Sequence, residues 1–239
     1  MMSHTTAEKP FKGIGMERGI ARWYASLTKK ALDDFKRDAR RMAERIPAGG
    51  RVLEVAPGPG YFAIELAKLG RHQVTGLDIS KTFVEIARSN AAEAGVNVDF
   101  RRGNASDMPF AAEAFDFIFC RAAFKNFSQP VRALQEMHRV LKPGGQAVII
   151  DLRRDASQES INSAIQNMQL SAANAFITKL TFRFMLLKRA YTARELEDMI
   201  VKTDFLAAEI DENFIGLEVS LKKGRDDAPA KTAAHVGNS

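Results

Sequence analysis

The stretch LEVAPGPG at residues 53–60 decides how the rest of the chain is interpreted. It joins a predicted strand, 51–56, to a predicted helix, 61–69, and its glycines allow the backbone to approach a ligand without a clashing Cβ atom. Asp78 ends the next predicted strand, 73–78, where its carboxylate could accept hydrogen bonds from both hydroxyls of a ribose. Ligands of doubly wound sheets bind at the carboxyl ends of the strands. The two features together predict a site for a nucleoside-bearing cofactor.

Strands and helices alternate on both sides of this stretch. Short apolar strands that alternate with helices are typical of a parallel sheet covered on both faces. After residue 151 the alternation stops, and a predicted hairpin supplies an antiparallel C-terminal edge. The sequence therefore predicts an α/β fold, a doubly wound Rossmann-like sheet of about seven strands. The predicted strands are 51–56, 73–78, 96–101, 115–120, 146–151, 207–212 and 214–222, and the predicted helices include 81–94, 128–141 and 193–202.

The segments flanking this core differ from it in composition. We expect a flexible lead-in at 1–15 and a small, polar, disordered tail at 223–239. Between them we expect a single domain, 16–222. It would consist of an N-terminal helical cap (16–46), a cofactor-binding core (51–151), and a helical lid rich in Met, Phe and Leu (156–189). Ser80 and Thr192 are predicted N-caps of helices.

Composition excludes several classes of protein. The chain has 239 residues, of which 46% are hydrophobic and 27% charged, and this share of apolar residues excludes a mainly disordered protein. The chain has one cysteine, which excludes a disulfide scaffold. We find no apolar run long enough to span a membrane and no signal-peptide core, and we expect a cytoplasmic protein. The net charge of +6 is modest, and residues 1–50 hold 11 Lys/Arg against 6 Asp/Glu. A nucleic-acid partner is not favoured, and the four His are not spaced as metal ligands.

The order of motifs resembles the class I S-adenosylmethionine-dependent methyltransferases. Within them it is most similar to small-molecule enzymes like the ubiquinone/menaquinone-biosynthesis methyltransferases. The resemblance covers about residues 50–151. It rests on the glycine turn, on Asp78, on GNASDMPF at 103–110, and most specifically on RVLKPGG at 139–145. Ala56 stands where the family usually has its first glycine, and Asn104 where it usually has an acid.

This resemblance implies S-adenosylmethionine as the cofactor, with S-adenosylhomocysteine as the product. Asp78 would bind the ribose, Ile79 would lie beside the adenine, and the Asn104 amide oxygen could accept from the adenine amino group. Gly58 and Gly60 would face the methionine portion. The full set of implied cofactor residues is Glu54, Ala56, Gly58, Gly60, Asp78, Ile79, Asn104, Ala105, Cys120 and Arg121.

In this family the acceptor residues usually come from the N-terminal helix, the loop after strand four and the insertion after strand five. Those places supply Trp23, Tyr24, Phe124, Lys125, Asn126 and Arg153. We therefore expect a small acceptor, aromatic or apolar and possibly anionic, methylated by in-line displacement. Arg121 and Asp151 are the candidate catalytic residues, although Asp151 could equally make a structural hydrogen bond.

Two alternatives stay open. The glycine turn also satisfies the G-x-G-x-x-A fingerprint of dinucleotide enzymes, so an NAD-dependent oxidoreductase is a competitor. Nucleic-acid methyltransferases share the fold, but the amino-group enzymes carry Asn/Asp-Pro-Pro-aromatic after strand four, where this chain has CRAA at 120–123. We expect a monomer or a homodimer.

Overall fold

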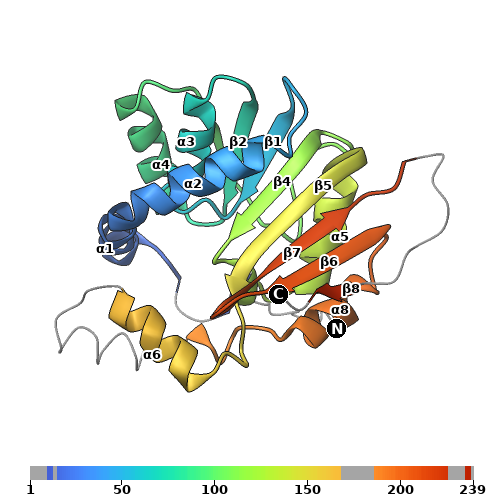
Figure 1. The fold of residues 1–239 in the computed structure, drawn as a ribbon. Helices are drawn as coiled ribbons and strands as arrows, with labels where there is room; N and C mark the ends of the chain where they lie inside the picture. Colours follow the sequence, from blue (N-terminus) through green and yellow to red (C-terminus); the bar gives the residue numbers. More distant parts are fainter. Residues whose placement is uncertain (1–9, 13–14, 168–185, 226–234, 238–239) are drawn as a thin grey trace, which may run out of the picture.

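A computed structural model describes residues 10–12, 15–167, 186–225 and 235–237. Figure 1 shows one twisted sheet with helices on both of its faces. The sheet has eight strands in the order β3-β2-β1-β4-β5-β7-β6-β8. The first five of these are parallel to one another, and β7 runs antiparallel between β5 and β6. The predicted Rossmann-like fold with an antiparallel C-terminal edge is confirmed.

The strands have the following bounds: β1 Arg51–Val55, β2 Gln73–Asp78, β3 Asp99–Arg102, β4 Phe115–Arg121, β5 Leu141–Leu152, β6 Ala207–Glu212, β7 Gly216–Lys222 and β8 His235–Gly237. The helices are α1 Arg18–Thr28, α2 Leu32–Ala43, α3 Tyr61–Lys68, α4 Lys81–Glu93, α5 Pro130–Val140, α6 Gln158–Asn167 and α8 Ala193–Ile200. Two short 3-10 turns complete the set, η1 Lys29–Ala31 and η2 Phe124–Asn126.

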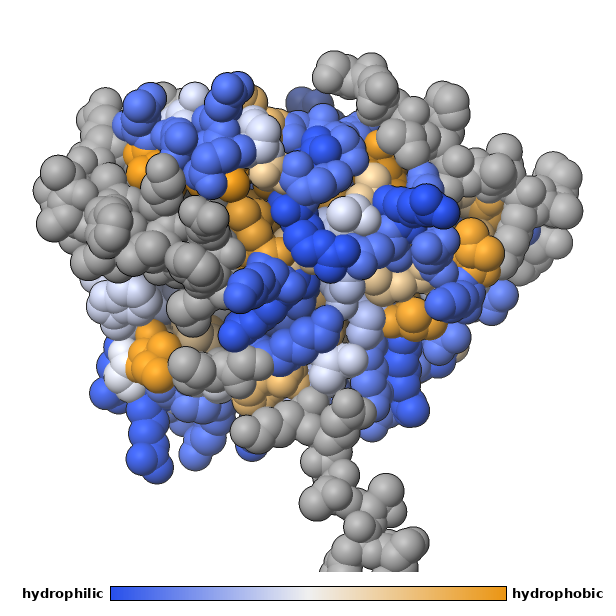
Figure 2. All heavy atoms as spheres, turned by 90° about the horizontal axis from the view of Figure 1, so that it is seen from below, coloured by the Kyte–Doolittle hydropathy of each residue, from blue (hydrophilic) through white to orange (hydrophobic). Residues whose placement is uncertain are grey.

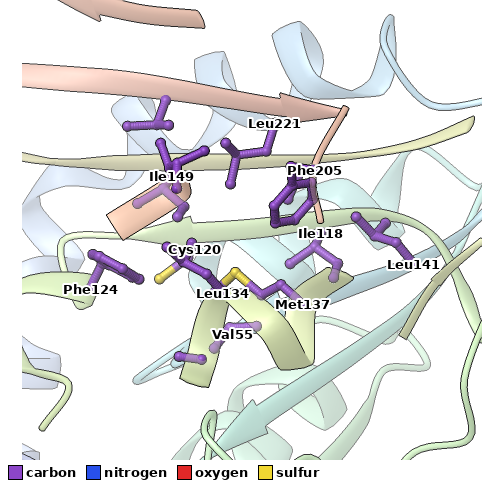
Figure 3. Close-up of a cluster of buried hydrophobic side chains, with 14 of the residues drawn as sticks. Val55, Ile118, Cys120, Phe124, Leu134, Met137, Leu141, Ile149, Phe205 and Leu221 are labelled. Atoms are coloured by element: carbon purple, nitrogen blue, oxygen red, sulfur yellow. The ribbon is translucent and has the colours of Figure 1, made fainter. Parts of the chain in front are cut away.

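Neighbouring residues on the central strands point to opposite faces of the sheet, as strand geometry requires. On one face Leu53, Ile118 and Ile149 pack against α5 and α8. Figure 3 shows this cluster, in which Leu134 and Met137 of α5 meet strand side chains. On the other face, Val52, Phe117, Phe119 and Val148 pack against α2, α3 and α4. Both faces of the parallel strands are therefore buried, which explains their nearly continuous apolar sequences.

Two predicted helix starts are confirmed by their caps. The hydroxyl of Ser80 accepts a hydrogen bond from the backbone N–H of Phe83 at the start of α4. Thr192 forms a reciprocal capping box with Glu195 at the start of α8. Each cap satisfies backbone N–H groups that lack a partner within the helix.

Several predicted boundaries differ from the structure. β5 begins at Leu141 instead of 146, because Leu141 pairs with Phe115 and the residues after it, 142–145, lie in an irregularity where the register shifts. What the sequence presents as a Pro-Gly turn is therefore part of the strand. β3 begins at Asp99 instead of 96, and β7 begins at Gly216 instead of 214.

The segments outside the parallel core form further elements. The predicted helical cap over 16–46 contains α1 and α2, which are joined by η1. In the tail, β8 pairs with β6 in parallel at the edge of the sheet. Of the predicted lid, 158–167 forms α6, while 168–185 lies outside the described residues.

Candidate cofactor and acceptor site

Because β1, β2, β4 and β5 run parallel, their carboxyl ends lie on one side of the sheet, the side that faces downward in Figure 1. Asp78 ends β2, Arg121 ends β4 and Asp151 lies near the end of β5. Figure 2 looks at the molecule from this side and shows hydrophobic side chains between hydrophilic ones. The predicted site residues of the core are therefore brought to one edge of one sheet, as the topology requires.

The loop after β1 is built around left-handed backbone conformations. Ala56, Gly58 and Gly60 all have positive φ, at 57°, 55° and 80°. A Cβ atom on Gly60 would lie 2.6 Å from Cζ of Phe100, so this glycine is required by packing. A Cβ atom on Gly58 would meet nothing within 4 Å. Gly58 is buried, yet it leaves open space beside its backbone, which fits the close approach of a ligand.

Asp78 is buried and closely bonded to that loop. Its Oδ2 atom accepts from the N–H of Gly58 at 3.0 Å, and its Oδ1 atom accepts from the N–H of Ser80 at 2.9 Å. Each carboxylate oxygen keeps a second lone pair, so two ribose hydroxyls could still donate to it. Burial raises the pKa of Asp78 to about 6, and the nearby charge of Glu17 adds to the rise.

Glu54 is the other buried carboxyl group of the loop. Its Oε2 atom accepts from the N–H of Ala63 in the first turn of α3, at 3.0 Å. Burial raises the pKa of Glu54 to about 8, and the charge of Asp78 raises it further, whereas the charge of Arg121 lowers it. At neutral pH this carboxyl group is therefore largely protonated in the protein alone and holds the strand–helix turn together.

The adenine-side residues lie beyond β2 and β3. Ile79 is half-buried, and its carbonyl accepts from the Arg102 guanidinium at 3.2 Å. The Oδ1 atom of Asn104 accepts from the N–H of Ser106 at 3.0 Å. One lone pair of the Asn104 amide oxygen is thus used to shape its own turn, and the other lone pair is what remains for a ligand. Ala105 packs against the core.

The end of β4 places Arg121 beneath the N-terminal cap. Its guanidinium lies over the ring of Phe35, 4.7 Å from the ring centroid, and its Nη1 atom lies 3.3 Å from Oδ2 of Asp38. Both partners belong to α2, so this arginine links the core to the cap. The preceding residue, Cys120, is completely buried among apolar side chains, and burial raises the pKa of its thiol well above the usual value. The side chain of Cys120 is therefore core, and only its backbone can line the site.

Lys125 and Asp151 form a buried ion pair. Nζ of Lys125 lies 2.6 Å from Oδ1 of Asp151 and also donates to the carbonyl of Ala122 at 2.6 Å. The other oxygen of Asp151 accepts from the backbone N–H of Lys125 at 2.9 Å. This carboxylate thus fixes the turn after β4. Because its partner is a buried cation, the geometry favours a structural role over that of a general base.

The other predicted acceptor residues are distributed unevenly. Phe124 is buried, with its ring centroid 5.4 Å from that of Phe127 and 6.0 Å from that of Tyr191. Arg153 is bound by two carboxylates, Asp155 at 2.8 Å and Glu212 at 2.6 Å. The backbone carbonyl of Asn126 accepts from the N–H of Lys12 at 2.7 Å. The contacts of Phe124 and Arg153 thus occupy side chains that the sequence offered to an acceptor, whereas the contact of Asn126 involves only its backbone.

Trp23 and Tyr24 are neighbours in α1 but face different surroundings. Trp23 is exposed to solvent. Tyr24 stacks edge-on against Phe83 at 5.9 Å. Burial raises the pKa of the Tyr24 hydroxyl, and the charges of Arg121, Asp151 and Asp78 also act on it. Tyr24 is therefore the α1 side chain that shares an electrostatic environment with the ends of β2, β4 and β5.

Glu17 is a site neighbour that sequence reasoning missed. Its carboxylate accepts from the N–H groups of Lys81 and Thr82 and from the hydroxyl of Thr82, at 3.0, 3.1 and 2.5 Å. The Ser80 hydroxyl donates to the carbonyl of Met16 at 2.6 Å. These bonds fasten the cap to the first turn of α4, two residues beyond Asp78. No short motif marks Glu17, because its partners lie more than 60 residues away in the sequence.

Several known proteins are similar to this chain. Residues 53–149 match the family model of a methyltransferase domain. A demethylmenaquinone methyltransferase of Chlorobaculum parvum is 39% identical over 129 residues, which cover 54% of this chain and 48% of that protein. The chain thus spans about half the length of the curated relatives it matches.

Solved structures extend the likeness of the fold to most of the chain. A putative S-adenosyl-L-methionine-dependent methyltransferase of Methanococcus maripaludis superposes with a TM-score of 0.72 at 19% identity, covering 91% of this chain and 98% of that one. A SAM-dependent methyltransferase of Aquifex aeolicus superposes with a TM-score of 0.63 at 20% identity, covering 83% and 97%. The likeness is one of fold and extends over most of the chain.

Proposed function

We propose that this protein is an S-adenosylmethionine-dependent methyltransferase acting on a small acceptor. The observation that carries the proposal is the arrangement of Asp78 and Gly58, a buried carboxylate bonded to a glycine N–H beside open space. The methyltransferase family match over 53–149 and the names of the relatives and structural neighbours support the same cofactor.

When bound, this cofactor supplies a sulfonium methyl group, which an acceptor atom attacks in line while the C–S bond breaks and a thioether leaves. The chain's own contribution is to orient the two reactants, which is catalysis by proximity. Asp78 accepts hydrogen bonds from the ribose hydroxyls, and the open backbone at Gly58 admits the methionine portion. Asn104 offers its remaining lone pair to the adenine amino group.

The acceptor side is formed by Tyr24 and Arg121. The raised pKa keeps the Tyr24 hydroxyl protonated at neutral pH, so it acts as a hydrogen-bond donor. The Arg121 guanidinium carries the positive charge of this region, with Asp38 as its partner in the protein alone. A donor and a cation together suit an oxygen-bearing aromatic acceptor that carries partial or full negative charge. The relatives named demethylmenaquinone methyltransferases support a ring acceptor of this kind.

Calorimetry tests the cofactor first. We expect wild-type protein to bind S-adenosylmethionine and S-adenosylhomocysteine with micromolar dissociation constants and NAD not measurably. Binding of NAD alone would overturn the proposal in favour of an oxidoreductase. Transfer of a radiolabelled methyl group to naphthols, hydroquinones, amines and thiols then tests the acceptor class, with naphthols and hydroquinones expected to be the best acceptors. Transfer to amines alone would contradict the acceptor proposal and leave the cofactor assignment intact.

A further inference from the structure

An apolar stripe on α1 faces solvent. Ile20, Trp23 and Leu27 are spaced so that they share one side of the helix, and their exposed fractions are 45%, 65% and 47%. We call these three residues the α1 stripe. The side of α1 that faces the protein is formed by Ala21 and Ala25, which are buried, and by the half-buried Tyr24. The small alanines let α1 pack closely and leave its larger apolar side chains outside.

Basic side chains form a second exposed row on the same segment. Arg18, Arg22 and Lys29 are exposed, and none of them makes an ion pair within the part of the chain that the structure describes. Their charge is not local to α1 alone, because residues 1–50 hold 11 Lys/Arg against 6 Asp/Glu. The exposed surface of α1 is thus apolar along one side and uncompensated positive along the other.

We propose that α1 docks on an anionic lipid surface. A helix with an exposed apolar stripe and a basic face lies in the plane of a membrane interface, where the apolar side chains enter the headgroup boundary and the cations meet anionic lipids. Trp23 fits this position, because tryptophan is favoured where an apolar and a wet environment meet. None of the described helices is long and apolar enough to cross a bilayer, so the contact is with the surface.

Anionic lipid is favoured over a second copy of the chain as the occupant. A second copy would bring two identical rows of Arg18, Arg22 and Lys29 together, and like charges in contact oppose association. A lipid surface of opposite charge complements the row instead. Docking would also bring the acceptor side of the site near the bilayer, since Tyr24 lies beside the α1 stripe, four residues after Ile20 and three before Leu27; this last consequence alone rests on the proposed function.

The chain carries a built-in reporter of this contact. Trp23 is the only tryptophan in the sequence, so all tryptophan emission comes from the α1 stripe. We expect the free protein to emit at long wavelength and to be quenched by iodide. Vesicles of phosphatidylglycerol mixed with phosphatidylcholine should shift the emission to shorter wavelength, block quenching and sediment with the protein. Vesicles of phosphatidylcholine alone should bind roughly a hundredfold less, since three basic residues contribute to the affinity for anionic lipid.

Two sets of variants separate the stripe from the rest of the molecule. The double variant Ile20→Ser, Leu27→Ser keeps Trp23 and should lose both the emission shift and co-sedimentation. Its matched control is Val201→Ser, Phe214→Ser, which alters two exposed apolar residues outside α1 (72% and 58% exposed) and should bind like wild type. The double variant Arg22→Glu, Lys29→Glu should lose the preference for anionic vesicles. Circular dichroism and thermal melting confirm that each variant is folded.

The measurements need no cofactor, so they do not depend on methyl transfer. The proposal is overturned if anionic vesicles leave Trp23 emission unchanged, or if Ile20→Ser, Leu27→Ser binds them as well as wild type does. It is also overturned if Trp23 in the free protein is already shielded from iodide, because another part of the chain or a second copy then covers the stripe. Light scattering would identify the second copy in that case.

Discussion

The Nζ atom of Lys125 lies 2.6 Å from Oδ1 of Asp151, and both side chains are almost completely buried. The pair ties the turn after β4 to the end of β5, and with it the segment that carries Arg121. Ala122, which follows Arg121 in this turn, adopts a positive φ of 57° and donates its N–H to the carbonyl of Ile150 at 2.7 Å. The ion pair therefore holds a strained turn next to the candidate site.

Breaking this pair from one side should be costly. We expect Asp151→Ala to lower the free energy of unfolding by about 3–5 kcal/mol, because it leaves a buried cation without its partner. The double variant Lys125→Met, Asp151→Leu should recover much of that loss, since no buried charge remains. Chemical denaturation measures both. A loss below about 1 kcal/mol in Asp151→Ala would contradict a structural ion pair.

The two glycines of the loop after β1 should behave differently when changed to alanine. Gly60→Ala should destabilise the protein by about 2 kcal/mol or more, because its new Cβ would clash with Phe100 and its backbone is left-handed. Gly58→Ala should lower the free energy of unfolding by only about 1 kcal/mol, because alanine disfavours the left-handed backbone but its Cβ meets no neighbour. The same change places a methyl group in the space assigned to the cofactor. Thermal melting and calorimetry together distinguish them. Unchanged cofactor affinity in a folded Gly58→Ala variant would argue against that space being the binding site.

Cofactor affinity should depend on pH through Asp78. The carboxyl group has a pKa of about 6 in the protein alone. In the proposed complex, ribose hydroxyls donate to its ionised form. Lowering the pH from 7.5 to 5 should therefore weaken cofactor binding by roughly tenfold, because the ionised share of the Asp78 carboxyl group falls by about that factor. Asp78→Asn should bind weakly at both values with little pH dependence. A flat profile in wild-type protein would contradict the assignment.

Stability should fall as the pH rises from 5 to 8. Glu54 has a pKa of about 8 in the folded protein, well above its value of 4.5 in an unfolded chain, so the folded state binds the extra proton. The stabilisation is complete below the unfolded pKa and is lost progressively up to the folded one. Glu54→Gln keeps a neutral side chain and should flatten this part of the profile. Urea denaturation between pH 5 and pH 8 measures the difference.

Removing the Arg121 side chain should affect use of the acceptor, whereas removing the Lys125 side chain should affect stability. Arg121→Ala should lower kcat/KM for the acceptor by roughly tenfold or more while changing cofactor affinity little, because its cation faces the acceptor side. Lys125→Ala should instead act mainly on stability, since its charge is already used by Asp151. Steady-state kinetics with calorimetry on both variants tests this division. Equal losses of cofactor and acceptor binding in Arg121→Ala would contradict it.

The parallel core was predictable because its signals are local. Each strand is a short apolar run, and Ser80 is a recognisable N-cap of α4. Once the strands are known to be parallel, Asp78 and the glycine loop must lie together at their carboxyl ends. The start of β5 was not predictable, because the residues at 142–145 have the composition of a turn and only their pairing opposite β4 places them in a strand. The burial of Lys125 likewise depends on Asp151, which lies 26 residues away.

The cap shows a different limit. The predicted helical cap at 16–46 does contain helices, but a helical pattern does not say which face of a helix is buried. The structure buries Ala21 and Ala25, because small side chains allow the close packing that holds α1 in place, and the carbonyl of Ala25 accepts from the Tyr61 hydroxyl at 2.9 Å. Contacts of this kind, like those of Glu17 with α4, join segments far apart in the sequence and leave no pattern in either one.

The central claim is that the carboxylate at the end of β2 holds the ribose of S-adenosylmethionine. Calorimetric titration of S-adenosylhomocysteine into wild type, Asp78→Asn and Asp78→Ala tests it most directly, with thermal melting to confirm that all three are folded. The account predicts micromolar binding to wild type and a loss of more than about tenfold in both variants, since two charge-assisted hydrogen bonds are removed. Equal affinity in wild type and a folded Asp78→Ala variant would contradict it.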